Sequence, residues 1–518
     1  MEKQIQAERL NPEMKSIDQK ALLGIGAICL IYAFLRFWHL TDSCLWFDEI
    51  FSIHAAEMDW RNLFWFVAQD LIHPPLFYVL LKIWIIVVGE SLFWLRFFPV
   101  LFSLLAVAPF VLLCRQLNFS ALAIAVALSF FAVNGSLIKY AQEIRMYSLL
   151  LFLALVSLWL FVRFLNTGKG FLFFVIVNIL LVYSHYFGWL IIASEIFAGL
   201  ILAREKLKRI FIMPAAVLVS YAPWIYAVWQ ASKINSNVGQ NIGWMTKPNF
   251  TTVFQFAFDL FEPIYFQNTN RDQLIIVLIT LTIIAVSIIV FGFFLAEWKN
   301  ENAVERRNFL LLLIFLFTPI LLAFAASWIL PYSVWGTRHL IIAFAPLVIL
   351  FGIIFSKIKF RELKIAGLSI ISLLFVAAFA FQAIRPAPKY IWCAWENLAL
   401  SLSPTRSETT RIYVFEDLVA YHFWFALRGS DRQFQIVKIN GIEGLTEDRA
   451  YFLPRGFDAV QTATQFEGDG FFIAFRDKDF NRFAPPLQNL IAQGYEIGEP
   501  QIYEAQGLKA FLVEIRKR

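Results

Sequence analysis

Long apolar runs separated by short polar segments dominate the hydrophobic pattern of this chain. A helix that crosses the core of a bilayer needs about 20 predominantly apolar residues. Runs that suit such helices are 21–40, 92–113, 121–138, 146–165, 171–183, 187–203, 210–229, 274–294, 309–330, 340–355 and 365–383. The pattern therefore predicts a polytopic α-helical membrane protein with about 11 transmembrane helices.

One shorter apolar run, 75–88, begins at the second of two prolines and carries Lys82 in its middle. Runs of this length are more often interfacial or re-entrant than membrane-spanning. We expect this run and 55–70 to form amphipathic helices on the outer membrane surface. Residues 41–91 would then be a structured first outer loop, and 231–272 a second outer loop that could act as a lid.

The character of the chain changes after about residue 385, where the polarity becomes that of a soluble domain. Apolar residues in short runs predict strands, and apolar residues at helical spacing predict helices. The predicted strands are 411–415, 434–439, 470–475 and 510–515, and the predicted helices are 418–427 and 485–493. We therefore expect a small α/β domain at 385–518 after a transmembrane domain at 21–384.

The composition agrees with a membrane protein, since 59% of the residues are hydrophobic and only 16% are charged, against roughly 25% charged in soluble proteins. Lys and Arg gather in the loops 163–169, 204–209, 297–307 and 356–364. Such loops face the cytoplasm, so the net charge of +6 does not indicate nucleic-acid binding. We predict a multi-pass protein of the plasma (inner) membrane, with residues 1–20 cytoplasmic and the domain 385–518 extracytoplasmic.

The four cysteines form no CxxC motif and no Cys/His cluster. Cys44 and Cys393 should both lie outside the cytoplasm, where a disulfide between them could form. Because sequence spacing cannot fix which cysteines pair, we do not predict this disulfide.

Charged residues and histidines interrupt the apolar pattern at the outer helix ends. They are Asp48, Glu49, His73, Arg96, Lys139, Glu143, Arg145, His185, Arg338 and His339, with Tyr147 beside them. Any one of them could be a solvated helix end or a snorkelling cation. An ionised group at membrane depth costs several kcal/mol unless it is paired or faces water. Their gathering on one face from five segments therefore favours a site.

The residue types suit group transfer from a lipid with an anionic head group. An Asp can act as general base towards an acceptor hydroxyl, and Arg or Lys can neutralise a departing phosphate. The apolar bundle would supply a groove for the lipid tail. No Gly-rich phosphate loop is present, so a soluble nucleotide donor has no evident site.

In order and spacing, five motifs together resemble those of the GT-C membrane glycosyltransferases. They are Asp48-Glu49, His73-Pro74-Pro75-Leu76, Glu143-Ile144-Arg145-Met146-Tyr147, Ser184-His185-Tyr186-Phe187-Gly188 and Thr337-Arg338-His339. The resemblance covers about 21–355 and is greatest to the bacterial branch of the dolichyl-phosphate-mannose protein mannosyltransferases, which includes the lipid A aminoarabinose and galacturonic acid transferases. It implies inverting transfer of a sugar from a polyprenyl-monophosphate carrier to an extracytoplasmic glycolipid, polysaccharide or protein.

The resemblance also implies roles for single residues. Asp48 would be the catalytic base with Glu49 supporting it, and His73 would shape the acceptor or donor pocket. Arg145 and Arg338 would hold the lipid phosphate, and the other substrate-binding candidates are Lys139, Glu143, Tyr147, His185 and His339. The aminoarabinose transferases have Lys-Pro-Pro in place of His73-Pro74-Pro75, which makes that sugar a less favoured substrate here.

Relatives can bind a metal near the site, and Glu49, His73 and His185 are weak candidate ligands. No metal-binding spacing such as HExxH is present, so we expect no metal to be required, and a divalent metal stays an option. Glu195 lies in the middle of the sixth apolar run. We interpret it as structural, with Asn178 as the candidate hydrogen-bond partner.

Two alternatives to a monophosphate-using glycosyltransferase stay open. One is a transporter or flippase for a lipid-linked sugar, which typically has internal repeats and broken helices that the sequence does not show. The other is a glycan ligase of similar architecture that uses a lipid pyrophosphate. The pair Asp48-Glu49 together with His73-Pro74-Pro75 favours the monophosphate type.

Overall fold

The computed structural model describes residues 19–234, 242–266, 274–298, 302–385, 389–402, 409–428, 434–440 and 451–518. The chain divides into two compact units. The helical unit contains the residues up to Leu40 and Leu71–Arg385, and the sheet unit contains Thr41–Asp70 and Pro386–Arg518. The first part of the predicted outer loop 41–91 thus packs with the C-terminal residues, and only its second part belongs to the helical unit.

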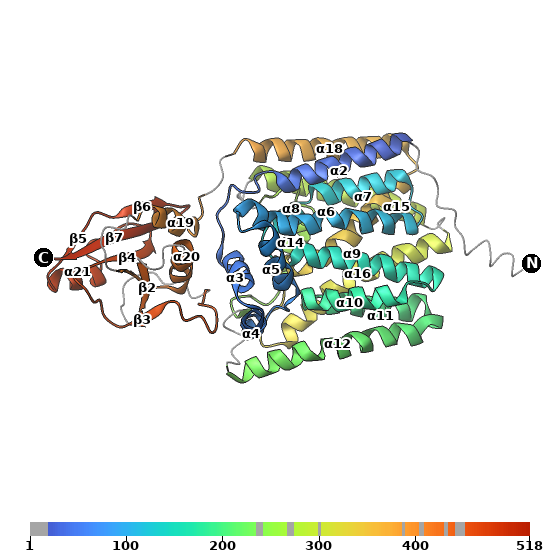
Figure 1. Cartoon of the computed structure of the whole chain (residues 1–518). Helices are drawn as coiled ribbons and strands as arrows, with labels where there is room; N and C mark the ends of the chain where they lie inside the picture. The colour runs from blue at the N-terminus through green and yellow to red at the C-terminus, as the bar shows by residue number, and fades with distance from the viewer. Residues whose placement is uncertain are drawn as a thin grey trace, which may run out of the picture. The chain divides into compact units, whose positions relative to one another are not determined.

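The helical unit is a bundle of long apolar helices (Figure 1). Its main helices are α2 (Gln19–Phe37), α6 (Leu92–Gln116), α7 (Ala121–Val133), α9 (Tyr147–Thr167), α10 (Phe171–Ser184), α11 (Gly188–Leu202), α12 (Leu207–Ile234), α15 (Leu274–Glu297), α16 (Ala303–Ile329), α17 (Phe344–Lys357) and α18 (Arg361–Ala383). In the described residues, 8 helical segments are long and apolar enough to cross a membrane. The predicted polytopic helical membrane protein is confirmed.

Two expected spans are shorter than predicted. Helices α7 and α11 have 13 and 15 residues, whereas α10, with 14 residues, agrees with the expected run 171–183. The expected third span, 121–138, is wrong as a single helix, because α7 ends at Val133 and α8 (Gly135–Gln142) starts anew. The side chain of Asn134 accepts a hydrogen bond from the backbone N–H of Leu137 and so caps α8, as Asn commonly does at helix starts.

Shorter helices complete the helical unit. The run predicted to lie outside the bilayer forms α5 (Leu76–Val88), which packs against α6 and α10. The second outer loop contains α14 (Phe250–Asp259). Residues 235–241 and 267–273 of that loop lie outside the described residues, so the expectation of a lid there stays a prediction.

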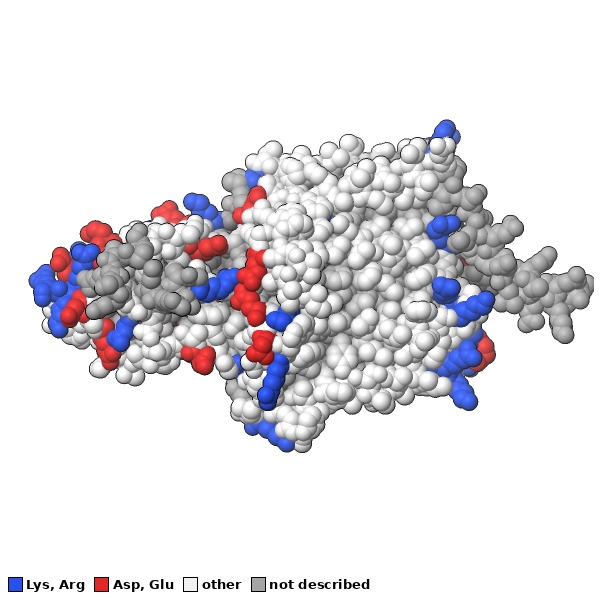
Figure 2. Space-filling view, in the orientation of Figure 1, with Lys and Arg blue, Asp and Glu red and all other residues white. Residues whose placement is uncertain are grey.

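The surface of the helical unit is divided by polarity (Figure 2). Its visible flank is almost free of charged side chains, and basic side chains gather at the end opposite α5 and α8. Large apolar side chains of the bundle, such as Val219 of α12, Leu321 of α16 and Leu373 of α18, are more than 60% exposed, at 75%, 62% and 69%. An apolar patch of this extent is foreign to the surface of a soluble protein, so this flank faces lipid.

The sheet unit is an α/β structure. Its helices are α3 (Phe47–Glu57), α4 (Trp60–Asp70), α19 (Cys393–Leu400), α20 (Asp417–Leu427) and α21 (Pro485–Ala492), and its strands are β1 (Thr410–Val414), β2 (Phe434–Ile439), β3 (Gln461–Ala463), β4 (Gly470–Asp477), β5 (Tyr495–Ile497), β6 (Gln501–Glu504) and β7 (Lys509–Lys517). The strand order is β3-β2-β1-β4-β7-β5, with β6 also paired to β7. The pairs from β3 to β4 are parallel, and β7 is antiparallel to its neighbours.

Alternation along the strands builds a core on each face of this sheet. Ile412 and Val414 pack towards α19 and α20, whereas Tyr413 and Phe415 belong to the core that includes α21. Successive side chains of a strand point to opposite faces, so the apolar strands require helices on both sides. The predicted strands and helices of the C-terminal domain are present. Helix α19 was not predicted, and neither were β3, β5 and β6, which have only three or four residues each.

The sheet unit contains the disulfide that the sequence did not predict. Cys44 and Cys393 are joined by a disulfide bond, with Cα atoms 5.4 Å apart and a separation of 349 positions in the sequence. Spacing alone could not find this pair, because only the folding of Thr41–Asp70 onto the C-terminal residues brings the two thiols together.

Candidate active site

The substrate-binding residues predicted from the sequence gather at one end of the helical unit. They come from the segment before α5, from α8 and the turn after it, from the turn between α10 and α11, and from the start of the 3-10 helix η3 (His339–Ala343). The ring centres of His73 and His185 are 5.9 Å apart, and those of His185 and His339 are 5.7 Å apart. The ring of Tyr147 lies 6.2 Å from His185 and 6.4 Å from His339.

Arg145 and His73 are joined directly. A guanidinium Nη2 of Arg145 lies 3.2 Å from Nε2 of His73, and both residues are buried. Because a guanidinium only donates hydrogen bonds, Nε2 of His73 must accept, and the proton of this imidazole is on Nδ1. His73 is therefore neutral and helps to orient Arg145.

His185 has the opposite tautomer. Its Nδ1 accepts a hydrogen bond from the backbone N–H of Phe187 at 3.0 Å, so its proton is on Nε2. Burial lowers the pKa of His185 well below its usual value, and the positive charges of Arg145 and Arg338 act in the same direction. The buried Nε2–H has no hydrogen-bond acceptor within the described part of the chain, which costs free energy unless a ligand accepts the bond.

Lys139 lies beside this cluster. Its Nζ is 3.8 Å from Oε1 of Glu143, four residues later, and 5.1 Å from the ring centre of Tyr265. Glu143 is buried and Lys139 is about one-quarter exposed, at 26%. The site thus contains a carboxylate that already offsets part of its positive charge.

Arg338 is placed by the second outer loop. Its guanidinium carbon lies 5.4 Å from the ring centre of Trp244, a distance typical of a cation–π contact. The hydroxyl of Thr337 donates to Asp259, the last residue of α14, whose other carboxylate oxygen accepts from Gln255 at 2.8 Å. Asp259 was not among the predicted site residues, although a lone carboxylate in the Phe-rich stretch 250–261 was a usable signal in the sequence.

Arg36, also missed, explains how α8 is positioned. This residue is fully buried, and its guanidinium donates to the backbone carbonyls of Phe131 and Ala132 at the end of α7. The last carbonyls of a helix have no partner within the helix, so Arg36 stabilises the break at Asn134. At the other end of α8, the Gln142 amide donates to the Trp38 carbonyl at 2.7 Å.

Arg96, which the sequence grouped with the site, has a structural contact. It is fully buried, and its Nη1 donates to the backbone carbonyl of Leu40 at 2.9 Å. It therefore secures the segment that follows α2.

The two predicted catalytic carboxylates lie in the sheet unit, in the first turn of α3. Asp48 is half-buried. Glu49 is fully buried, and its Oε2 accepts from the backbone N–H of Trp46 at 3.2 Å. This is the reciprocal contact of a capping box, so Glu49 helps to start α3.

The two histidines among the candidate metal ligands use their nitrogen lone pairs in hydrogen bonds in this arrangement. A neutral imidazole has one nitrogen lone pair, and those of His73 and His185 accept from Arg145 and Phe187. Oε2 of Glu49 accepts a hydrogen bond from the backbone N–H of Trp46. Among the residues that the structure describes, no group of three or more His, Cys, Asp or Glu has metal-binding geometry.

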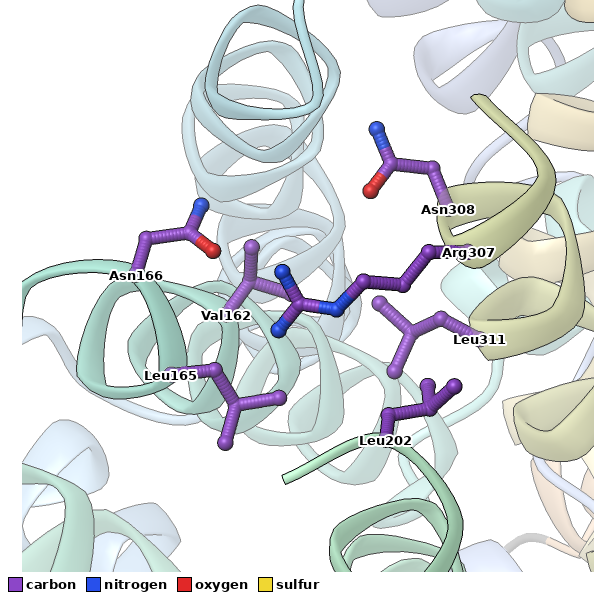
Figure 3. A pocket seen from close by; sticks show the side chains of 7 residues that line it. All are labelled: Val162, Leu165, Asn166, Leu202, Arg307, Asn308 and Leu311. Carbon is purple, nitrogen blue, oxygen red and sulfur yellow. The ribbon is translucent and has the colours of Figure 1, made fainter. Parts of the chain in front are cut away.

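A small cavity lies at the far end of α9 from Tyr147 (Figure 3). It is lined by Val162, Leu165, Asn166, Leu202, Arg307, Asn308 and Leu311 and has a volume of about 10 Å³. That is room for about one water molecule, so it cannot hold a sugar or a lipid head group. The 21 residues of α9 span about 30 Å, which separates this cavity from the histidine cluster.

Glu195 lies in a polar cluster among three helices. The hydroxyl of Ser157 donates to Oε1 of Glu195 at 2.5 Å, and the Asn178 amide donates to that hydroxyl at 2.9 Å. All three residues are fully buried. The cluster joins α9, α10 and α11, which agrees with the structural interpretation and adds Ser157 as the intermediate.

This chain is similar to known proteins in its three-dimensional structure. No family model and no curated protein matches the chain. Among solved structures, ArnT from Cupriavidus metallidurans bound to undecaprenyl phosphate matches with a TM-score of 0.55 and 12% identity, over 96% of this chain and 98% of that chain. The same protein in the apo state matches with a TM-score of 0.53 and 12% identity, over 95% and 97%.

The fold is that of the GT-C glycosyltransferases. Both units of the chain take part in this likeness, because the match to ArnT, an aminoarabinose transferase, extends over almost the whole of each protein. The GT-C fold was the expectation from the ordered motifs, and it is confirmed. At 12% identity the likeness is one of fold.

A second match is less similar in structure to this chain. The Archaeoglobus fulgidus oligosaccharyltransferase, in complex with Zn and sulfate, gives a TM-score of 0.46 and 17% identity. The match covers 78% of this chain and 61% of the oligosaccharyltransferase. This chain thus spans less than two thirds of the length of that protein.

Proposed function

We propose that this protein is a glycosyltransferase that moves a sugar from a polyprenyl-monophosphate carrier to an acceptor outside the cytoplasm. The observation that supports it most is the cluster of buried Arg145, buried His185 and partly buried Arg338 at one end of an apolar bundle. These groups supply two positive charges and one Nε2–H donor. A lipid phosphate offers the matching negative charge and acceptor oxygens. The ArnT structure with undecaprenyl phosphate supports a donor of this class.

The cluster can favour departure of the lipid phosphate. During transfer the bond between C1 of the sugar and the bridging phosphate oxygen breaks, and the phosphate takes both electrons. Its charge rises from about −1 to about −2, and preorganised donors that face the growing charge stabilise it. Arg145, held by His73, and Arg338, held beside Trp244, are oriented before the substrate binds.

Asp48 is the proposed general base. Its carboxylate accepts the proton of the acceptor hydroxyl while that oxygen forms the new bond to C1, so protons and charge balance. Attack opposite the departing phosphate inverts the configuration at C1. The place of Asp48 in the first turn of α3, half-buried rather than enclosed in the core, supports this role. Glu49 would support it by capping the same helix.

The disulfide supports the proposed orientation. Cys44–Cys393 belongs to the sheet unit, and disulfides persist in oxidising compartments outside the cytoplasm. We therefore propose that the sheet unit is extracytoplasmic and that the N-terminus and the basic loops are on the cytoplasmic side of the plasma (inner) membrane. Under this proposal, transfer of the sugar to the acceptor takes place outside the cytoplasm.

A transporter for a lipid-linked sugar is the second candidate. The break between α7 and α8 favours it, because transporters often bind substrates at broken helices. A transporter would carry the donor across the membrane without cleaving the bond between sugar and phosphate. Release of free polyprenyl phosphate therefore separates the two functions.

The test uses purified full-length protein in nanodiscs with a panel of polyprenyl-monophosphate sugars and a membrane extract as acceptor. We expect one donor to release polyprenyl phosphate with the wild type and not with Asp48→Asn. The matched control is Asp469→Asn, which changes an 82% exposed carboxylate of the same unit and should leave the rate unchanged. Normal release by Asp48→Asn would exclude Asp48 as the base, and donor binding without release would favour the transporter.

A further inference from the structure

The first outer segment and the C-terminal residues are joined by links along the whole length of Thr41–Asp70. The disulfide Cys44–Cys393 lies at its beginning. Farther along, Nδ1 of His54 is hydrogen-bonded to the Tyr421 hydroxyl at 2.9 Å, and Glu57 pairs with Arg428 at 3.2 Å. At its end, Arg455 donates to the Gln69 carbonyl at 2.7 Å. One covalent bond and three polar contacts thus fix this segment to the C-terminal domain.

His54 is the most enclosed of these contacts. It is 8% exposed, and the ring centres of Trp424, Phe66 and Phe457 lie 4.6, 4.9 and 5.4 Å from its own. In such apolar surroundings an imidazole nitrogen without a hydrogen bond is costly. The hydroxyl of Tyr421 meets this need and sets the position of the ring.

The anchored face of α3 is next to the face that bears Asp48. Phe47 and His54 are seven residues apart and so lie on the same side of the helix. Both contact Tyr421 of α20. The ring centre of Phe47 lies 5.1 Å from that of Tyr421, and His54 is hydrogen-bonded to the Tyr421 hydroxyl. Asp48 follows Phe47 directly and is rotated by about 100° from it. Anchoring Phe47 and His54 therefore sets the direction in which Asp48 projects.

We propose that His54 is a positioning residue for Asp48, and that the C-terminal domain acts through Tyr421 and the disulfide as the rigid support of α3. This inference rests on the proposed function, in which Asp48 is the general base. It assigns the C-terminal domain a role that does not require contact with substrate. A catalytic group displaced by about 1 Å can lose about 100-fold in rate, so loosening α3 should lower kcat.

The kinetic test compares His54→Leu, His54→Asn and Tyr421→Phe. The first keeps an apolar side chain without the nitrogen, and the second offers an amide oxygen near the position of Nδ1. We expect kcat to fall about tenfold or more in His54→Leu and Tyr421→Phe and to recover substantially in His54→Asn. KM for the donor should not change, because the residues proposed to hold its phosphate are in the helical unit. The double variant His54→Leu/Tyr421→Phe should be no slower than either single variant.

A second measurement does not depend on activity. Amide hydrogen exchange of Phe47–Glu57 should become about tenfold faster in His54→Leu and Tyr421→Phe, as expected for the loss of one buried hydrogen bond. Exchange in β4 should stay as in the wild type, which shows that the sheet is folded. The control Arg411→Ala removes an exposed ion pair with Glu467 in the same unit and should change neither kcat nor the exchange of α3.

The outcomes separate the inference from the proposed function. If Asp48→Asn is inactive and folded Tyr421→Phe or His54→Leu keeps a wild-type kcat, the positioning role is wrong and the proposed function stands. If Asp48→Asn keeps full activity, the proposed function is wrong and the positioning role is lost with it. Faster exchange of α3 together with a lower kcat and recovery in His54→Asn would support the positioning role.

Discussion

At the scale of single residues, the partners of the three histidines decide what each ring can do. His73 accepts from Arg145, a residue that only donates, and His185 accepts from a backbone N–H. Nδ1 of His339 lies 3.3 Å from the Val334 carbonyl, which only accepts, so this nitrogen is a donor. Three identical side chains within one cluster thus have different roles, and His185 alone presents a buried donor without an acceptor among the described residues.

The first prediction concerns Arg338. Replacing it by Ala removes one of the two cations proposed to hold the lipid phosphate, and a hydrogen bond to a charged group contributes about 1.5–3 kcal/mol. We expect Arg338→Ala to weaken binding of a polyprenyl-monophosphate sugar by about 10- to 100-fold. Binding can be measured by titrating labelled donor into nanodiscs, with Arg411→Ala as the control. An unchanged affinity would mean that the phosphate binds elsewhere.

At the scale of elements, the break at Asn134 directs α8 and the turn that bears Arg145. The backbone N–H of Gly135 donates to the Glu262 carbonyl at 2.8 Å, and that of Ile264 to the Val133 carbonyl at 2.8 Å. The second outer loop thus completes the backbone hydrogen bonds that an uninterrupted helix would have made. Because unpaired polar backbone is costly at membrane depth, the break requires this partner segment.

A substitution at Gly135 tests whether the break between α7 and α8 depends on the second outer loop. A Cβ at this position would lie 2.6 Å from Cβ and 2.8 Å from the backbone N of Tyr265, so the backbone would have to shift. We expect Gly135→Ala to destabilise the helical unit by about 1–3 kcal/mol and to weaken donor binding. Gly24→Ala is the matched control, because nothing lies within 4 Å of that Cβ. Thermal unfolding in nanodiscs measures the difference, and equal midpoints would contradict the account.

In the sheet unit, two buried histidines predict a pH dependence. Burial lowers the pKa of His54 to about 4, with a contribution from Arg428, and burial lowers that of His422 to about 3. Between these values and the unfolded value of about 6.5, the unfolded chain binds more protons than the native unit. The free energy of unfolding therefore falls as the pH falls.

At pH 5 the loss should be about 2 kcal/mol for each histidine relative to pH 7, from about 1.4 kcal/mol for each pH unit below 6.5. The loss can be measured by urea unfolding at pH 7, 6 and 5, with hydrogen exchange in β4 as the probe of unfolding of the sheet unit. The variant His54→Asn/His422→Asn lacks both titrating groups and should show a flatter profile. A wild-type profile as flat as that of this variant would contradict the prediction.

At the scale of the whole molecule, a membrane bundle and an α/β domain share one chain that passes between them more than once. The chain leaves the helical unit after Leu40, contributes Thr41–Asp70 to the sheet unit, and returns for Leu71–Arg385. The disulfide closes this path covalently. The sheet unit therefore includes the segment that carries Asp48, and it is more than a C-terminal appendage.

The proposed orientation gives a prediction at the same scale. A reporter that is active only outside the cytoplasm should be active after Arg518, and a cytoplasmic reporter should be active when fused before Met1. The basic loops at one end of the bundle (Figure 2) and the disulfide are the reasons. The opposite result at Arg518 would overturn the expected count of membrane spans.

The sequence by itself determined the features that depend on local pattern. Apolar runs have to be helical at membrane depth because only helices satisfy their own backbone polar groups there, and the continuous apolar stretches of β1 and β7 required cover on both faces of the sheet. The ordered motifs indicated the GT-C fold, and residues such as Arg145 and His185 stood out because ionisable groups are rare in apolar segments.

Only the tertiary structure decided which distant groups meet. Arg36 appeared in the sequence as one cation in a first membrane helix, and its partners, the carbonyls of Phe131 and Ala132, are almost 100 residues away in the chain. The same holds for Cys44 with Cys393 and for His54 with Tyr421. Periodicity reports which face of an element is buried, whereas hydrogen bonds and disulfides require atoms within a few ångströms, and that proximity is set by packing of the whole chain.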